Sequence, residues 1–219
     1  VYSFENKKHM TSGGEGGMII TSNENYAVKM RKFAGIGFKN LTASAGRVSM
    51  ATSEFQNPSY LRHDMVGLNY RMTALNAAVG LAQLERIDDL VSRRIKIGNM
   101  FEEAVRGCTW MIPQGRIKDA NHTYLTAPFK FLGEELRSIT WKEFYNRYVS
   151  MGGDGFYAAW MNPYLEPSLL GKKFGNTECK ISLCPIAEDL QKKLMLFKTN
   201  YRNIDEAAKK AEILYKLIN

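Results

Sequence analysis

The sequence predicts an α/β chain in which a long helix joins an incomplete N-terminal lobe to a small C-terminal α/β lobe. Three observations support this organisation. Only two short strands and one short helix can be placed within residues 1–72. The strongest helical periodicity of the chain follows over 73–107. From 108 to 219 strands alternate with helices, which is typical of an α/β lobe.

The first lobe opens with two predicted strands, at 1–4 and 17–21, separated by a glycine-rich link. Four glycines among residues 13–17 are too many for a helix or a regular strand, and they favour a tight turn or a close backbone approach. A helix is predicted at 23–35, where Asn23 can cap the first turn. Two strands and one helix cannot close a doubly wound sheet, so we interpret this lobe as incomplete.

The middle of the chain contains a long irregular segment and then the connecting helix. Residues 37–66 show no clean periodicity, and loops of that length are usually functional. A short amphipathic stretch is expected near 48–52. The following helix would span about 50 Å if it were unbroken. A kink is expected near Asp88 and Asp89.

The second lobe is predicted from 108 onwards, with an irregular excursion over 162–176. Aromatic residues such as Tyr157 and Trp160 are interpreted as packing residues. The expected strands are 123–131, 155–160 and 180–183, and the expected helices are 141–151, 188–198 and 204–218.

Composition limits the possible partners. The chain has 30 basic and 22 acidic residues, and its net charge of +8 favours anionic partners. The basic residues are scattered, so we expect no nucleic-acid partner. The sequence contains neither a membrane-spanning window nor the layout of a signal peptide, and we expect a cytoplasmic protein without a membrane partner. The three cysteines form no CxxC pair and the three histidines lie far apart, so neither a disulfide framework nor a metal site is predicted.

One lysine stands out by its position. Lys8 lies between the end of the first strand and the glycine-rich link, where a side chain is held yet reachable. A lysine that forms an imine needs a partly deprotonated amine, which burial can provide. The hydroxyl of Ser3, five residues earlier, could bond a phosphate. From these residues alone, the adjacent Lys7 and Lys8 also fit an ordinary surface turn.

The stretch from Ser3 to Gly17 resembles the active-site segment of the DegT/StrS-type sugar aminotransferases, a branch of the fold-type I pyridoxal-phosphate (PLP) enzymes. The family pattern is Ser-Phe, three variable residues, the Schiff-base lysine and then Gly-Glu-Gly-Gly. The resemblance implies that Lys8 is the catalytic and cofactor-binding lysine and that Ser3 contacts the PLP phosphate. Gly13 and Gly14 make the spacing one residue longer than is commonest in the family.

A second block, residues 67–73, resembles the family motif Gly-x-Asn-Tyr-Arg-Met. The resemblance implies that Asn69 reaches across a homodimer interface to the phosphate of the neighbouring subunit's PLP. It also implies that Arg71 binds a substrate carboxylate, which a guanidinium can hold through two hydrogen bonds. Without the resemblance, Asn69 would be a turn residue and Arg71 a surface ion-pair partner. Stretches such as 152–160 also resemble the small lobe of members that aminate nucleotide-linked sugars, and no role is assigned from them.

The implied fold is the C-terminal part of the fold-type I large domain, followed by the long helix and the small domain. The implied activity is PLP-dependent transfer of an amino group, with glutamate as the expected donor, to a keto-sugar nucleotide in deoxysugar biosynthesis. Related dehydratases, which use pyridoxamine phosphate, carry histidine where the lysine belongs. Lys8 followed by His9 therefore favours the aminotransferase. A non-catalytic basic module that binds nucleotides or other polyanions is the alternative from a different class.

The resemblance covers only the second half of the family's length. In the family, the missing half supplies the aspartate at the PLP ring nitrogen, the aromatic that stacks on the ring and most of the phosphate loop. We therefore expect the 219-residue chain alone to bind PLP poorly and to show little or no transaminase activity.

Overall fold

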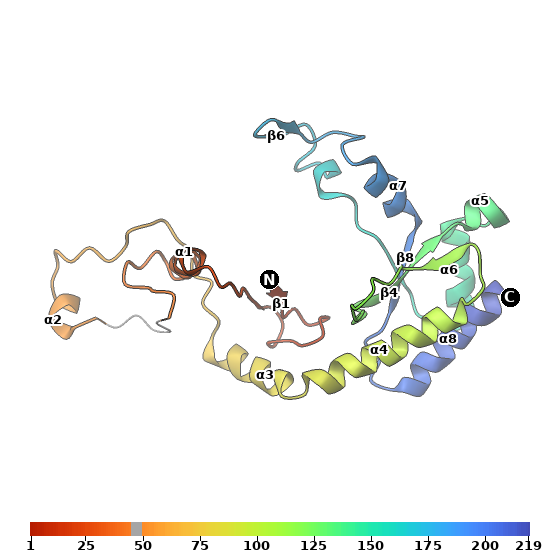
Figure 1. Cartoon of the computed structure of the whole chain (residues 1–219), viewed down its shortest axis with the longest axis horizontal. Helices are drawn as coiled ribbons and strands as arrows, with labels where there is room; N and C mark the ends of the chain where they lie inside the picture. Colours follow the sequence, from red (N-terminus) through yellow and green to blue (C-terminus); the bar gives the residue numbers. More distant parts are fainter. Residues whose placement is uncertain (45–49) are drawn as a thin grey trace. The chain divides into compact units, whose positions relative to one another are not determined.

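The computed structural model describes residues 1–44 and 50–219 of the chain (Figure 1). It divides into two compact units, Val1–Ile87 and Asp88–Asn219. No helix within the described residues is long and apolar enough to cross a membrane. The described residues also contain no group of three or more His, Cys, Asp or Glu side chains placed to hold a metal ion.

The first unit begins with a small antiparallel hairpin. Strand β1 (Tyr2–Ser3) pairs with β2 (Gly17–Met18), so that Ser3 lies opposite Gly17. Helix α1 (Glu24–Ala34) follows, and the predicted cap is confirmed, because Asn23 Oδ1 accepts a hydrogen bond from the Tyr26 amide at 3.1 Å.

The segment between α1 and the next long helix is tied at its base. The Lys39 amide donates to the Arg62 carbonyl at 3.0 Å, and the Asp64 amide donates to the Gly37 carbonyl at 3.1 Å. Gly37 has φ of +75°, and a Cβ there would lie 1.9 Å from the Met65 carbonyl oxygen. The segment therefore leaves and returns at neighbouring points. Its only helix in the described residues is α2 (Thr52–Phe55), and residues 48 and 49 of the amphipathic stretch expected near 48–52 lie outside those residues.

The predicted connecting helix is two helices. Helix α3 (Ala74–Leu84) ends in a turn at Glu85 and Arg86, and α4 (Ile87–Ala104) begins directly after it. The interruption therefore lies just before the expected kink at Asp88 and Asp89. The Glu85 amide still bonds the Leu81 carbonyl at 3.0 Å, and the Arg86 amide bonds the Gln83 carbonyl, only three residues earlier, at 3.1 Å. The last turn of α3 is therefore tightened toward a 3₁₀ turn.

The second unit contains a four-stranded sheet in the order β3-β4-β8-β5, with every pair antiparallel. Helices α4, α6 and α8 lie on one side of it (Figure 1). Side chains alternate along the central strands, and Phe129, Met195 and Phe197 enter the core. The bounds are Met111–Pro113 for β3, Thr126–Phe131 for β4, Tyr157–Ala158 for β5, Leu194–Lys198 for β8, Trp141–Ser150 for α6 and Ile204–Ile218 for α8.

Two predicted elements of this unit were wrong. The helix expected at 188–198 ends early, because α7 spans Pro185–Lys193 and the next five residues form the central strand β8. The strand expected at 180–183 is a turn. Partly buried and fully buried residues alternate along Leu194–Lys198, which fits a strand. Pairing with strands on both sides outweighs the local helical pattern. Strand β3 was not predicted either. The remaining elements, which were also not predicted, are α5 (Gly133–Arg137), the 3₁₀ turn η1 (Pro163–Leu165), β6 (Lys173–Phe174) and β7 (Thr177–Glu178).

The two units differ in their cores. The main hydrophobic cluster runs from Ile97 to Leu214 and lies wholly in the second unit. In the described part of the first unit, the buried hydrophobic residues are Phe4 and Leu41. Large apolar side chains such as Met18 and Ile20 are more than half exposed there. The first unit therefore depends mainly on local hydrogen bonds and close glycine contacts.

Candidate active site

The loop that carries Lys8 is closed by backbone hydrogen bonds. The buried Phe4 donates its amide to the Gly16 carbonyl at 2.8 Å, and its carbonyl accepts from the Ser12 amide at 3.1 Å. The Lys8 amide donates to the Glu5 carbonyl at 3.0 Å, which forms a tight turn. Within that turn the Lys8 residue is half-buried, whereas Lys7 is exposed.

The glycine-rich link is compact, for a steric reason. Ser12 is fully buried, and its hydroxyl donates to the Glu15 carbonyl at 3.0 Å. A Cβ on Gly16 would lie 2.1 Å from Ser12 Oγ, so a larger residue would displace the serine. Gly13 and Gly14 have φ of +87° and +128°, which L-residues rarely adopt. The longer Gly-Gly spacing is thus accommodated in a conformation that glycine permits.

Helix α3 supports this link from outside. The side-chain amide of Asn76 donates to the Ser12 carbonyl at 2.6 Å. Thr73 caps the helix, because its hydroxyl accepts from the Asn76 amide at 3.2 Å. A Cβ added to Gly80 would lie 3.7 Å from Ser12 Cβ, so the helix and the link approach closely. The two sequence motifs are therefore joined through the first turns of α3.

Asn69 and Arg71 lie on the strand-like segment before α3. Asn69 forms an antiparallel bridge with Gly35, which fixes its backbone. Its amide oxygen accepts from Arg71 Nε at 3.0 Å and from the Arg71 backbone amide at 3.4 Å. Neither bond uses the Asn69 Nδ2 donors or the terminal guanidinium nitrogens of Arg71. Both residues are exposed.

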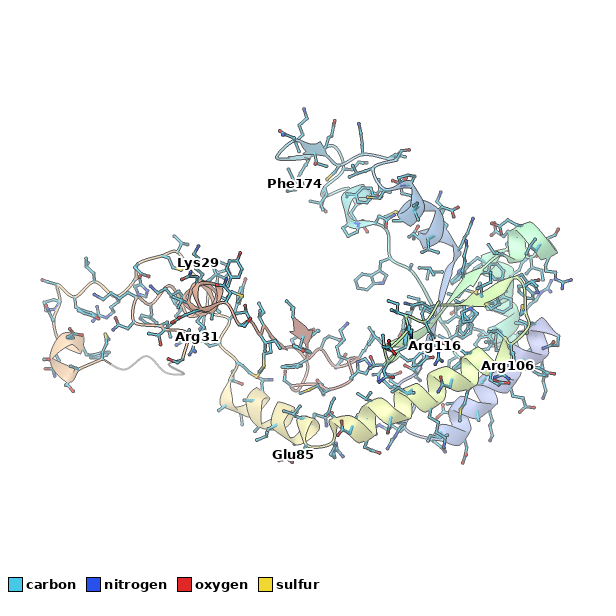
Figure 2. The ribbon with its side chains drawn as sticks, in the orientation of Figure 1. Lys29, Arg31, Glu85, Arg106, Arg116 and Phe174 are labelled. Carbon is cyan, nitrogen blue, oxygen red and sulfur yellow. The ribbon has the colours of Figure 1, made fainter. Side chains whose placement is uncertain are left out.

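A groove of about 1240 Å³ lies within the first unit. Arg71 and Tyr2 contribute to its lining, together with Lys29 and Arg31 of α1, which are labelled in Figure 2. Three basic side chains therefore border a largely apolar groove. Ser3, Lys8 and Asn69 are not among its lining residues, so of the predicted site residues the groove includes only Arg71.

Sequence reasoning missed the supporting residues Ser12 and Asn76. Ser12 was seen only as part of a flexible link, although its burial holds the link together. The sequence does show that Asn76 lies three residues after the Thr73 cap. Its bond to Ser12, 64 residues earlier, cannot be identified from one sequence.

The donor set of the first unit suits two parts of PLP. Ser3 Oγ accepts weakly from the Glu5 amide at 3.5 Å, so its hydroxyl hydrogen can be donated to a phosphate oxygen. The Asn69 Nδ2 group is a second uncharged donor of the same kind. Lys8 supplies a primary amine, the group that condenses with an aldehyde. By the chemistry of these donors, the chain fits the phosphate and aldehyde ends of the cofactor.

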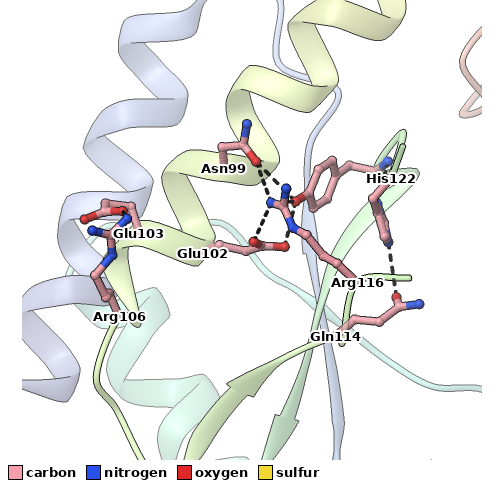
Figure 3. A network of polar contacts seen from close by, with 8 residues as sticks. Asn99, Glu102, Glu103, Arg106, Gln114, Arg116 and His122 are labelled. Carbon is pink, nitrogen blue, oxygen red and sulfur yellow. Dashed lines mark hydrogen bonds and ion pairs between the residues drawn. The ribbon is translucent and has the colours of Figure 1, made fainter. Parts of the chain in front are cut away.

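The second unit contains a separate polar network, which has a structural role (Figure 3). One guanidinium nitrogen of Arg116 donates to Asn99 at 2.8 Å, to Glu102 at 2.7 Å and to the Tyr124 hydroxyl at 2.6 Å. Tyr124 in turn donates to Glu102 at 2.6 Å. Burial and the hydrogen bond to Glu102 raise the pKa of Tyr124 to about 12. The network fastens the loop before β4 onto α4.

The fold of this chain is similar to that of solved aminotransferase and dehydratase structures. The X-ray structure of an aminotransferase from Psychrobacter cryohalolentis matches 98% of this chain with a TM-score of 0.78 and 21% identity, over 54% of its own length. The Escherichia coli GDP-4-keto-6-deoxy-D-mannose-3-dehydratase, solved with hydrated PLP, matches 97% of the chain with a TM-score of 0.72 and 17% identity, over 53% of its length. Because aminotransferase and dehydratase both match, the fold alone does not separate the two activities.

The chain belongs to the DegT/DnrJ/EryC1/StrS aminotransferase family, whose model matches residues 1–184. The resemblance found in the sequence is thereby confirmed. Among curated relatives, the GDP-perosamine synthase of Escherichia coli O157:H7 is 32% identical over 123 residues, covering 56% of this chain and 28% of that protein. The GDP-perosamine synthase of Caulobacter vibrioides is 37% identical over 102 residues, covering 47% and 23%. The chain thus spans about half the length of the solved structures, and its alignments span about a quarter of these curated relatives.

Proposed function

We propose that this chain supplies the lysine-bearing half of a PLP-dependent aminotransferase that aminates a keto-sugar nucleotide. One observation carries the proposal: in a chain of this family, Lys8 is half-buried in a loop that Ser12 and Asn76 hold in place. The relatives that are named for GDP-perosamine support a nucleotide-linked sugar as the amino acceptor.

Each proposed site residue has a role that its chemistry allows. Ser3 and Asn69 donate hydrogen bonds to the cofactor phosphate, with Asn69 acting across the interface of a homodimer. Arg71, oriented by Asn69 Oδ1, binds the carboxylate of an amino donor such as glutamate through its two terminal nitrogens. When bound, PLP supplies an aldehyde for the amine and an electron sink for the reaction. The Lys8 amine removes the proton from Cα of the amino donor and returns a proton during amination of the sugar.

The dehydratase alternative differs at one position. A histidine cannot form an imine with PLP, whereas a lysine can, and the residue five after Ser3 is Lys8. The alternative therefore requires the neighbouring His9 to act in place of Lys8. Product analysis separates the two reactions, because an aminotransferase yields an amino sugar and a dehydratase yields a deoxy sugar.

The test is reduction of the protein–PLP mixture with borohydride, followed by peptide mapping. We expect the reduced adduct on Lys8, with Lys7→Ala as the matched control that retains it and Lys8→Ala as the variant that loses it. We expect a low yield from the 219-residue chain and a high yield from a longer chain that carries the other half of the fold before Val1. Equal labelling of Lys7 and Lys8, or no Lys8 adduct in either chain, would contradict the proposal.

A turnover assay completes the test. The 219-residue chain is expected to show little or no transamination of a GDP-linked keto-sugar by glutamate, whereas the longer chain is expected to be active. Robust turnover by the 219-residue chain would show that the other half of the fold is dispensable. Polyanion binding that depends on salt, without any PLP adduct in either chain, would instead favour a non-catalytic basic module.

A further inference from the structure

The side chain of Trp160 is almost fully exposed to solvent. Its exposed fraction is 90%, although the sequence led us to expect a packing residue. The other two tryptophans behave as expected. Trp110 is 4% exposed in the core, and Trp141 is half-buried with its indole nitrogen donating to the Leu194 carbonyl at 3.1 Å. The expectation was therefore wrong for Trp160, whose side chain is almost fully exposed.

The backbone that leads to this exposed indole is firmly held. Phe156 is buried, and its ring centroid lies 4.5 Å from that of Phe197 in the core. The next two residues form β5, in which Tyr157 pairs with Leu196 of the central strand β8. The Ala159 carbonyl then accepts a hydrogen bond from Gln191 Nε2 of α7 at 2.9 Å. Trp160 thus follows directly from an anchored edge strand.

The chain is also anchored beyond Trp160. The 3₁₀ turn η1 begins at Pro163, and the Leu165 amide donates to the Asn162 carbonyl at 2.8 Å. The Tyr164 hydroxyl donates to Glu188 of α7 at 2.9 Å. An exposed indole between two fixed points loses little conformational freedom when a flat ligand binds to it, and such pre-organisation favours binding.

Positive charge is available on the adjoining helix. Lys192 and Lys193 occupy the last turn of α7, directly after the Gln191 that bonds Ala159. Lys193 forms ion pairs with Glu135 and Asp189, whereas Lys192 is exposed. An aromatic face and an exposed ammonium suit the two chemical parts of a nucleoside diphosphate, its planar base and its anionic phosphates.

We infer that Trp160 is the stacking platform for the nucleobase of the nucleotide-linked sugar, with Lys192 attracting its diphosphate. This inference rests on the proposed function, since the nucleotide is a part of the substrate proposed there. Stacking on an aromatic side chain contributes to affinity without reading the base edge, so we expect several nucleoside diphosphates to bind Trp160.

The experiment is a titration of the 219-residue chain with GDP, monitored by tryptophan fluorescence. We expect GDP to quench the exposed component of the emission and inorganic diphosphate to have little effect. Equilibrium dialysis then measures affinity independently of the fluorophore. Trp160→Phe is expected to bind GDP within about twofold of the unchanged chain. Trp160→Ala is expected to bind about tenfold more weakly, the effect of one stacking contact worth about 1.4 kcal/mol.

Phe174→Ala is the matched control, because Phe174 is another exposed aromatic of the same unit, on β6 (Figure 2). Its GDP affinity is expected to be unchanged. Lys192→Ala is expected to weaken binding severalfold at low salt and less at high salt. Equal quenching by GDP and inorganic diphosphate, or an unchanged affinity of Trp160→Ala, would overturn the inference. Trp160 emission that shifts with protein concentration and not with GDP would also overturn it, because the indole would then lie in a protein contact.

This test requires no PLP. A Lys8 adduct without a GDP response at Trp160 would leave the proposed aminotransferase intact and remove only the nucleobase platform. A GDP response without a Lys8 adduct in either chain would retain the nucleotide site and remove the proposed chemistry.

Discussion

The side-chain amide of Asn76 donates a 2.6 Å hydrogen bond to the backbone carbonyl of Ser12, a fully buried residue 64 positions earlier. The bond connects the helix that follows the Asn69–Arg71 motif to the glycine-rich link that follows Lys8. In a unit with few buried apolar side chains, this contact has more influence on local order than it would have in a well-packed core.

Replacement of Asn76 by aspartate should loosen the Lys8 loop. The substitution preserves shape but places a carboxylate oxygen, which cannot donate, against the Ser12 carbonyl. We expect amide hydrogen exchange at Ser12 to accelerate roughly tenfold, as for the loss of a buried hydrogen bond of about 1–2 kcal/mol. Asn57→Asp is the control, because Asn57 acts through its oxygen, which accepts from the Ser59 amide at 2.9 Å. Unchanged exchange in Asn76→Asp would show that the bond does not hold the loop.

Gly98→Ala should destabilise the second unit. A Cβ at this position of α4 would lie 2.4 Å from the Tyr124 ring, and the buried ring has little room to move. We expect a loss of about 1–3 kcal/mol in the free energy of unfolding, measured by urea denaturation with Trp110 fluorescence. Gly115→Ala, where a Cβ meets nothing within 4 Å, should change that free energy by less than about 0.5 kcal/mol. Equal effects of the two substitutions would contradict the steric explanation.

Alkaline pH should destabilise the second unit through Tyr124. Burial and the hydrogen bond to Glu102 raise the folded-state pKa to about 12, whereas an unfolded tyrosine titrates near 10. The stabilisation is complete below pH of about 10, because both states are then protonated. It is lost as pH rises from about 10 to about 12, because the unfolded state releases its proton first.

Urea denaturation across that range tests this pH dependence. The free energy of unfolding should fall with pH more steeply in the unchanged chain than in Tyr124→Phe. Burial also raises the pKa values of Tyr148 and Tyr201, so the variant should retain a shallower decline. Identical slopes would mean that Tyr124 ionises equally readily in the folded and unfolded states.

Acid should weaken the second unit through Asp154. Burial alone would raise its pKa, but hydrogen bonds from Tyr201, Lys210 and Lys198 outweigh burial and lower the pKa below its ordinary value. The resulting stabilisation is present above the unfolded pKa of about 4 and is lost as pH falls through the folded pKa. In Asp154→Asn, urea denaturation should show a flatter dependence below pH of about 4. Asp119→Asn, at an exposed loop position, should follow the unchanged chain.

Local patterns predicted several elements because their determinants are close in sequence. Asn23 caps α1 through a residue three positions away, and the amphipathic stretch 204–218 matches α8. The helix predicted over 188–198 was wrong in its second half, because Leu194–Lys198 pairs with strands on both sides to complete the sheet. The prediction that Trp160 packs in the interior was wrong, because an aromatic residue type favours burial on average. The sequence did not reveal that the residue follows an edge strand and lies at the surface.

The sequence by itself determined the family and the Lys8 and Asn69–Arg71 motifs, because short spacings of particular residue types carry that information. Tertiary structure decided that the helix pattern after Thr73 divides at Glu85 and Arg86, that the Asn69 amide oxygen is occupied by Arg71, and that Ser12 is buried against Asn76. These outcomes depend on contacts between segments up to 64 residues apart. Such contacts are set by packing and hydrogen bonding in three dimensions, which no local periodicity encodes.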